Sequence, residues 1–263
     1  MTVLSFIACR MFEDEITHII ENDPSIRKLI VVENEDCAGL TDKLDSAGCK
    51  YELMQFSSLP RMSGIDEEDG LTLIVYMLEL ALHARPDNLK KVVYEKTEEL
   101  SRYADGILLF YGLCGNVLGK IEEDFSSSPC IVRILKEDNG TVVDDCIGAV
   151  LGGRAAYLEK LTGSRGVGTF FMTPMWAAHW REMVVSAGMT QDPNDIKMSK
   201  FVFDHAGYKN VARMDTGLYY EKDFNFMVEE FARLFEFNII EMRASPELIK
   251  NCYRKLRADV PGC

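Results

Sequence analysis

Short apolar runs alternate with amphipathic segments along most of this chain, and this alternation constrains the fold more than any other feature. Seven runs are interpreted as buried strands: Val3–Ala8, Lys28–Val32, Gly106–Tyr111, Cys130–Leu135, Gly168–Met172, Val211–Met214 and Asn238–Met242. The predicted helices are Phe12–Glu21, Ala38–Ala47, Leu71–His83, Leu89–Tyr103, Cys146–Leu161, Met175–Ala187, Asp195–His205, Phe226–Phe235 and Pro246–Arg257. Continuous apolar strands separated by helices favour an α/β fold, with a mostly parallel sheet covered by helices on both faces in three layers.

The length of 263 residues suits one large domain or two lobes. The glycine-containing stretch Gly163–Gly168 is the best candidate for a boundary. We therefore predict an N-terminal α/β lobe over residues 1–165 and a C-terminal α/β lobe over residues 166–263 packed on it. A single domain is the alternative. The segment Ser57–Gly70 is polar and irregular and is expected to be a loop.

The charge balance excludes several classes of partner. The formal net charge is −13. An acidic surface repels phosphate backbones and anionic membrane surfaces, so neither nucleic acid nor membrane is expected as a partner. The N-terminal apolar run has no basic leader, and the run Leu71–Ala84 is too short to cross a bilayer. These features predict a cytoplasmic protein whose eight cysteines are reduced thiols.

Three cysteines share one context at the ends of predicted strands. Cys9 follows the first strand, Cys114 follows the Gly106–Tyr111 strand, and Cys146 begins a helix. Because ligands of parallel sheets bind at the carboxyl ends of the strands, these thiols are candidate metal ligands. A helix N-terminus also favours the thiolate form, which is the form that binds metal. Gly112 and Gly115 would let the backbone approach a bound group.

Three soft ligands leave one coordination position open. That pattern is typical of a catalytic zinc, or of a [4Fe-4S] cluster with one exposed iron. The alternative is that the three cysteines are small core residues, since free cysteine is among the most buried residue types. The remaining cysteines, at positions 37, 49, 130, 252 and 263, are expected to be structural.

Charged residues near these cysteines have several possible roles. Asp144 and Asp145 could ligate metal, act as a base or cap the helix that follows them, and capping is the default. Arg85 or Arg133 could hold an anionic substrate. His179 lies on a predicted helix, where a lone histidine is more often a surface or satisfied residue. The sequence contains no phosphate-binding loop and no dinucleotide fingerprint.

Four motifs in a fixed order carry a family resemblance. They are Leu82-His83-Ala84-Arg85-Pro86-Asp87, Phe110-Tyr111-Gly112-Leu113-Cys114-Gly115-Asn116, Asp145-Cys146-Ile147 with Leu151-Gly152-Gly153, and Gly168-Thr169-Phe170-Phe171-Met172-Thr173-Pro174-Met175-Trp176. Together they resemble the domain of unknown function 1638 family of methanogenic archaea and anaerobic or methylotrophic bacteria. The resemblance spans about Val3 to Tyr220.

The resemblance implies a metal role but no settled activity. Its recurrent cysteines match Cys9, Cys114 and Cys146, and its members resemble accessory proteins encoded near corrinoid-dependent methyltransferase systems. The family often has Pro-Arg closely followed by His-Asp-Cys. Here Arg133 is separated from Asp145-Cys146 by a longer polar loop, and Asp144 stands in place of the histidine. A fourth, histidine-type ligand is therefore in doubt.

Three functions compete at this stage. In the first, a metal held by Cys9, Cys114 and Cys146 acts on a small-molecule substrate or a methyl group in anaerobic one-carbon metabolism, with Asp145 beside the ligands or acting as a base. In the second, the chain is a non-catalytic accessory protein that binds metal or a corrinoid methyltransferase component. A small-molecule sensor without chemistry is the third.

Overall fold

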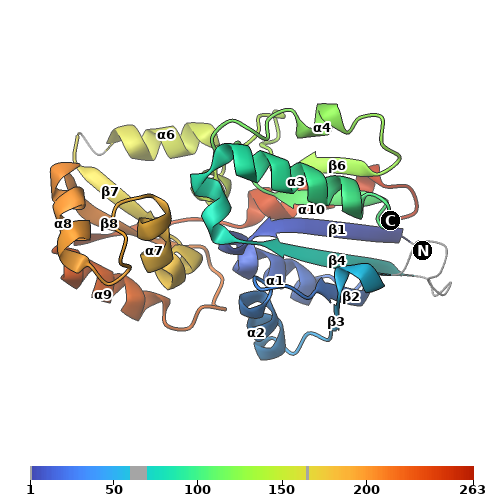
Figure 1. Ribbon diagram of the computed structural model, residues 1–263, viewed down its shortest axis with the longest axis horizontal. Coiled ribbons are helices and arrows are strands. Elements are labelled where there is room, and N and C mark those ends of the chain that lie inside the picture. Colours follow the sequence, from blue (N-terminus) through green and yellow to red (C-terminus); the bar gives the residue numbers. More distant parts are fainter. Residues whose placement is uncertain (1, 60–69, 164–165) are drawn as a thin grey trace.

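The computed structural model describes residues 2–59, 70–163 and 166–263, and these form two parallel sheets (Figure 1). The first sheet has six strands in the order β3-β2-β4-β1-β5-β6, and the second has three in the order β7-β8-β9. All pairings between these strands are parallel. The predicted α/β fold with parallel sheets is therefore confirmed.

The elements have the following bounds. The strands are β1 Thr2–Cys9, β2 Ile26–Val32, β3 Glu52–Met54, β4 Leu71–Leu78, β5 Gly106–Phe110, β6 Ile131–Ile134, β7 Gly168–Met172, β8 Tyr208–Asp215 and β9 Asn238–Arg243. The α-helices are α1 Glu13–Asn22, α2 Ala38–Ser46, α3 Pro86–Leu100, α4 Ile121–Asp124, α5 Cys146–Leu151, α6 Arg154–Gly163, α7 Pro174–Ser186, α8 Ile196–His205, α9 Phe224–Phe235 and α10 Glu247–Asp259. Short 3-10 helices are η1 Arg10–Phe12, η2 Phe56–Ser58 and η4 Leu80–Ala84.

Strand β1 lies at the centre of the first sheet, between β4 and β5. All of its residues are buried, which is why its sequence reads as one apolar run without alternation. Phe6 pairs with Val75 of β4 and with Leu108 of β5. Its ring packs against Phe110 at a centroid distance of 4.8 Å and against Tyr253 of α10 at 5.5 Å. These contacts join the central strand to the helical layer.

The order of the strands places the helices on opposite faces. The chain moves from β1 to β2 in one direction along the sheet, and from β4 to β5 in the other. Right-handed crossovers therefore put α1 and α3 on opposite faces, as Figure 1 shows. Helix α10 returns from the second sheet to the face that carries α1, where the Tyr253 hydroxyl donates to Asp23 at 2.7 Å.

The prediction of a helix over Leu71–His83 is wrong. Residues Leu71–Leu78 form strand β4, and the chain then turns into η4. A short apolar run does not distinguish a buried strand from a buried helix by periodicity. The β-branched residues Thr72, Ile74 and Val75 suit the pleated surface, and β4 is buried between β2 and β1.

The prediction of one helix over Cys146–Leu161 is also wrong, since the segment forms α5 and α6. Gly152 ends α5 with a left-handed φ of 89°, and Gly153 follows with a φ of 117°. The Glu137 side chain fills the space where a Cβ at Gly153 would lie. Its Oε1 accepts from the Arg154 backbone N–H at 2.8 Å. This contact sets the start of α6.

The last strand of the first sheet, β6, ends at Ile134, and the first strand of the second sheet, β7, begins at Gly168. The predicted boundary over Gly163–Gly168 stays a prediction. No helix in the described ranges is long and apolar enough to span a membrane.

We expect Gly106→Ala to lower the free energy of unfolding by about 1–3 kcal/mol, the usual range for overpacking. A Cβ at Gly106 would lie 2.7 Å from Val260 and 3.0 Å from both Leu256 and Leu4, so strand β5 and helix α10 would have to separate. Urea denaturation measures the change. Gly163→Ala is the control, since its Cβ would meet no described atom within 4 Å. Equal stability of the two variants would contradict this account of the packing.

Candidate functional site

The three cysteines singled out by the sequence meet at one edge of the first sheet. Cys9 is the last residue of β1, Cys114 lies in the loop after β5, and Cys146 is the first residue of α5. The chain leaves β1 and β5 toward opposite faces of the sheet, so a crevice opens where these neighbouring strands end.

A cavity of about 300 Å³ occupies this edge. Its lining residues are Cys9, Met11, Phe12, Tyr111, Cys114, Gly115, Asp144, Asp145, Cys146, Trp176 and Met183. Trp176 and Met183 belong to α7, which follows the first strand of the second sheet. The cavity is therefore built by both sheets, and its walls are apolar apart from the thiols, the tyrosine and the two aspartates.

Close backbone contacts bring the Cys114 loop to the start of α5. The Leu113 N–H donates to the Val143 carbonyl at 2.8 Å, and the Cys114 N–H donates to the Asp144 carbonyl at 3.1 Å. A Cβ at Gly112 would lie 2.5 Å from the Val143 oxygen. Glycine is thus required at position 112 for the approach of two loops. Gly112 does not line the cavity, whereas Gly115 does.

Burial keeps the three thiols protonated at neutral pH. It raises the pKa of Cys9 to about 12 and that of Cys114 to about 11, and it raises the pKa of Cys146 well above its ordinary value. A negative charge on Cys114 raises the pKa of Cys9 and of Cys146 further. The N-terminus of α5 does not offset this desolvation, contrary to the expectation of a lowered pKa at Cys146.

The indole of Trp176, on the helix that follows the first strand of the second sheet, contacts one of the three thiols. The Trp176 Nε1–H donates to Cys146 Sγ at 3.3 Å. Thr173 caps α7 by accepting from the Trp176 backbone N–H, also at 3.3 Å, and Pro174 occupies the first turn.

The three charged residues that the sequence suggested for the site, Asp145, Arg85 and Arg133, lie in different parts of the structure. Asp145 lines the cavity and caps α5, accepting from the Gly148 N–H at 2.8 Å, and burial raises its pKa. Arg85 is exposed at the start of α3. Arg133 lies at a separate cavity, where it pairs with Asp259 at 2.7 Å. Of these three side chains, Asp145 is the one that reaches the thiols' cavity.

Across residues 2–59, 70–163 and 166–263, no group of three or more histidine, cysteine, aspartate or glutamate side chains could hold a metal ion as arranged. The three thiols therefore share a cavity without forming a ready-made metal site.

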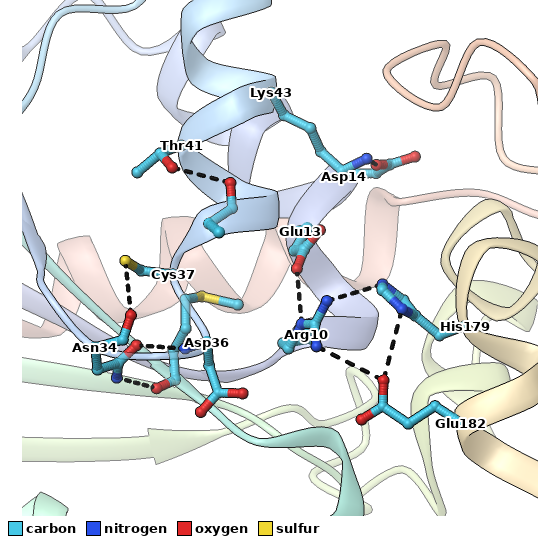
Figure 2. A network of polar contacts seen from close by, with 12 residues as sticks. Arg10, Glu13, Asp14, Asn34, Asp36, Cys37, Thr41, Lys43, His179 and Glu182 are labelled. Carbon is cyan, nitrogen blue, oxygen red and sulfur yellow. Dashed lines mark hydrogen bonds and ion pairs between the residues drawn. The ribbon is translucent and has the colours of Figure 1, made fainter.

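A polar network that sequence reasoning missed lies beside Cys9 (Figure 2). Arg10 Nε donates to Glu13 Oε1 at 3.4 Å, its Nη2 lies 3.4 Å from His179 Nε2, and its Nη1 lies 3.7 Å from Glu182. His179, expected to be a surface or satisfied residue, therefore links α7 to the end of β1. The signal in the sequence is an arginine directly after a buried strand.

Three successive acids begin α1 next to this network. Glu13, Asp14 and Glu15 are all buried, and Lys43 pairs with Asp14 at 3.2 Å. Burial raises the pKa of Glu13 to about 7 and that of Glu15 to about 8. A Cβ at Gly39 would lie 2.5 Å from the Glu13 carboxylate, so α2 leaves space for that group. In the sequence, the signal for this buried cluster is a run of three acidic residues shortly after a buried strand.

The fold and cavity define a parallel α/β protein with a thiol-lined site between two sheets. Residues 77–253 match the family described as "Protein of unknown function (DUF1638)", and the chain belongs to this family. The match includes Cys114 and Cys146 and begins after Cys9. Asp144 pairs with Arg154 at 2.9 Å. No curated protein and no solved structure matches the chain.

We expect Glu15→Gln to flatten the dependence of stability on pH. The folded protein raises the Glu15 pKa from 4.5 to about 8, so the native state binds the proton more tightly than the unfolded state. This contribution is complete below pH 4.5 and is lost as the pH rises through 8. Wild type should therefore lose stability, by roughly a few kcal/mol at most, across this window. Urea denaturation at several pH values measures the slope, and an unchanged slope in the variant would contradict the assignment.

Proposed function

We propose that this chain is a metal-thiolate protein of anaerobic one-carbon metabolism. Cys9, Cys114 and Cys146 would bind one soft metal ion, with zinc as the first candidate and a [4Fe-4S] cluster as the alternative. The observation that supports this proposal is that three segments far apart in the sequence bring three thiols to one cavity: the end of β1, the loop after β5 and the start of α5. Three ligands leave a position for a small substrate.

The charge of the cavity supports a cationic occupant. Among the described residues that line it, none is a lysine, arginine or histidine, and a negative charge on Cys114 raises the pKa of both Cys9 and Cys146. A soft cation would supply the missing positive charge and release the thiol protons. Since the sulfurs are not grouped for ligation as they stand, binding requires the three sulfurs to come closer together.

The walls of the cavity suit chemistry that excludes water. Met11, Phe12 and Met183 contribute apolar surface. A thiolate-bound zinc supplies a Lewis acid that activates a thiol or polarises a small substrate. Asp145 is the candidate base, because its carboxyl lines the same cavity. The proposal does not use Arg85 or Arg133, which lie away from the thiols.

The substrate class comes from the family resemblance. Proteins encoded near corrinoid-dependent methyltransferases point to a small methyl donor or acceptor. A cavity of about 300 Å³ is at the lower end of the range for small-molecule sites.

The test is the metal content of protein purified without oxygen. We expect about one zinc per chain with no visible colour, and iron with acid-labile sulfide would identify the cluster instead. Replacing Cys9, Cys114 or Cys146 by alanine should weaken metal affinity more than about 100-fold, since even outer partners of ligands contribute about 10–100-fold. Cys49→Ala is the control, because Cys49 does not line the cavity. Wild type without metal after reconstitution would overturn the proposal.

A non-catalytic accessory role is the second candidate, and exposed aromatic residues of the C-terminal part of the chain favour it. Tyr219 is 79% exposed, and Phe201 and Phe226 are each 66% exposed. Exposed aromatic side chains are enriched at protein–protein interfaces. A purified corrinoid methyltransferase component should bind wild type, and Tyr219→Ser with Phe226→Ser should weaken that binding at least tenfold in calorimetry. Equal affinity of wild type and variant would remove this candidate.

A further inference from the structure

One face of α7 lies against the thiol site. The helix carries Trp176, His179 and Met183 at successive spacings of three and four residues, and Glu182 lies three residues after His179. Residues three or four apart lie on the same side of a helix. Trp176 and Met183 line the cavity, and His179 and Glu182 contact Arg10. Helix α7 follows β7 of the second sheet. One wall of the cavity therefore comes from the second sheet's part of the chain, whereas the three thiols come from segments of the first sheet's part.

The two ends of this face contact two different cysteine segments. At one end, the Trp176 Nε1–H donates to Cys146 Sγ at 3.3 Å. At the other end, His179 and Glu182 lie 3.4 and 3.7 Å from Arg10, the residue after Cys9 (Figure 2). Helix α7 is therefore anchored beside two of the three thiols.

The Trp176 side chain is held by the second sheet. Its ring packs edge-on against Phe170 of β7 at a centroid distance of 5.5 Å, and Phe170 stacks on Phe231 of α9 at 5.0 Å. The cap from Thr173 fixes the first turn of α7. Trp176 also packs against the core of the first sheet, so contacts with both cores set the direction of the indole N–H at the cavity.

We propose that Trp176 is a positioning residue of the thiol site: its indole N–H holds Cys146 Sγ at the cavity, so that metal binding depends on the second sheet being docked on the first. This rests on the proposed function, because it takes Cys146 as a ligand. By reciprocity, the bound ion would also strengthen the docking of the two sheets.

The chemistry of the donor sets the expected effect. An indole donates one hydrogen bond and accepts none, so its partner is the sulfur in any protonation state. The bond strengthens when the sulfur carries charge, as a thiolate or a metal-bound thiolate does. Removal of the N–H should therefore weaken metal affinity on the order of tenfold.

Trp176→Phe and Met175→Leu form the matched pair for this test. Both residues lie on α7, and Trp176 lines the cavity and donates a hydrogen bond to a thiol, whereas Met175 is buried away from the cavity. Affinity for Cd²⁺ is measured by competition with a chromophoric chelator, and the thiolate-to-metal absorbance band reports the ligands. We expect Trp176→Phe to bind about tenfold more weakly than wild type. Met175→Leu should stay within about twofold, as volume-conserving swaps are tolerated.

A second readout needs no metal. The chain has two tryptophans, so Trp180→Phe leaves Trp176 as the single fluorophore. With excitation at wavelengths that tyrosine does not absorb, Trp176 is the residue that emits. Because Cys146 Sγ touches the indole, its removal by Cys146→Ala in that background should change the Trp176 emission. Far-UV circular dichroism checks that each variant is folded. The same emission from both proteins would overturn the contact.

The outcomes separate the two proposals. If wild type binds Cd²⁺ and Trp176→Phe binds it equally well, the positioning role is overturned and the proposed function stands. Weak binding by both Trp176→Phe and Met175→Leu would show a general loss of packing and would also overturn it. Wild type that binds no Cd²⁺ overturns the proposed function, and the role of Trp176 in metal binding with it.

Discussion

The parallel pairing of β1 with β4 on one side and β5 on the other is the constraint on which the rest of the structure depends. Because the strands are parallel, their carboxyl ends lie at one edge, and everything that follows a strand begins there. That edge receives Cys9 from β1 and the Cys114 loop from β5. The loop after β6 then brings Cys146 to the same edge through the backbone contacts that Gly112 permits.

Buried titratable groups lie on both sides of the end of β1, and they have different charged neighbours. On one side, the acids of α1 lie near Arg10 and Lys43, whose positive charges oppose the rise in the Glu13 pKa. On the other side, the thiols share a cavity without a basic side chain among its described lining residues. Burial raises the pKa of both kinds of group. Lys43 opposes the rise at Glu13, Asp14 and Glu15, whereas among the three thiols a cation, Arg10, opposes it at Cys9 alone. This difference makes the thiol side the place where a positive ligand would be most stabilised.

The sequence predicted most elements because their patterns are local. Continuous apolar runs identified β1, β5 and β7, and helical spacing identified α1, α7 and α9. Leu71–Leu78 was mistaken for a helix, since an apolar run of that length fits either structure until its neighbours are known. The break between α5 and α6 depends on Glu137, which lies in a separate turn. The predicted division into two lobes stays a prediction, and α10 packs on the first sheet after the chain has formed the second.

The sequence by itself determined the α/β class, the family, and the position of three cysteines at strand ends, because each depends on residues within a short segment. Only the tertiary structure decided that these cysteines share one cavity and that Trp176 and Met183 complete its wall. It also decided that Arg10, at the end of β1, contacts His179 of α7, while Arg133 pairs with Asp259 away from the thiols. These are contacts between segments far apart in the chain, and strand order and helix packing bring them together.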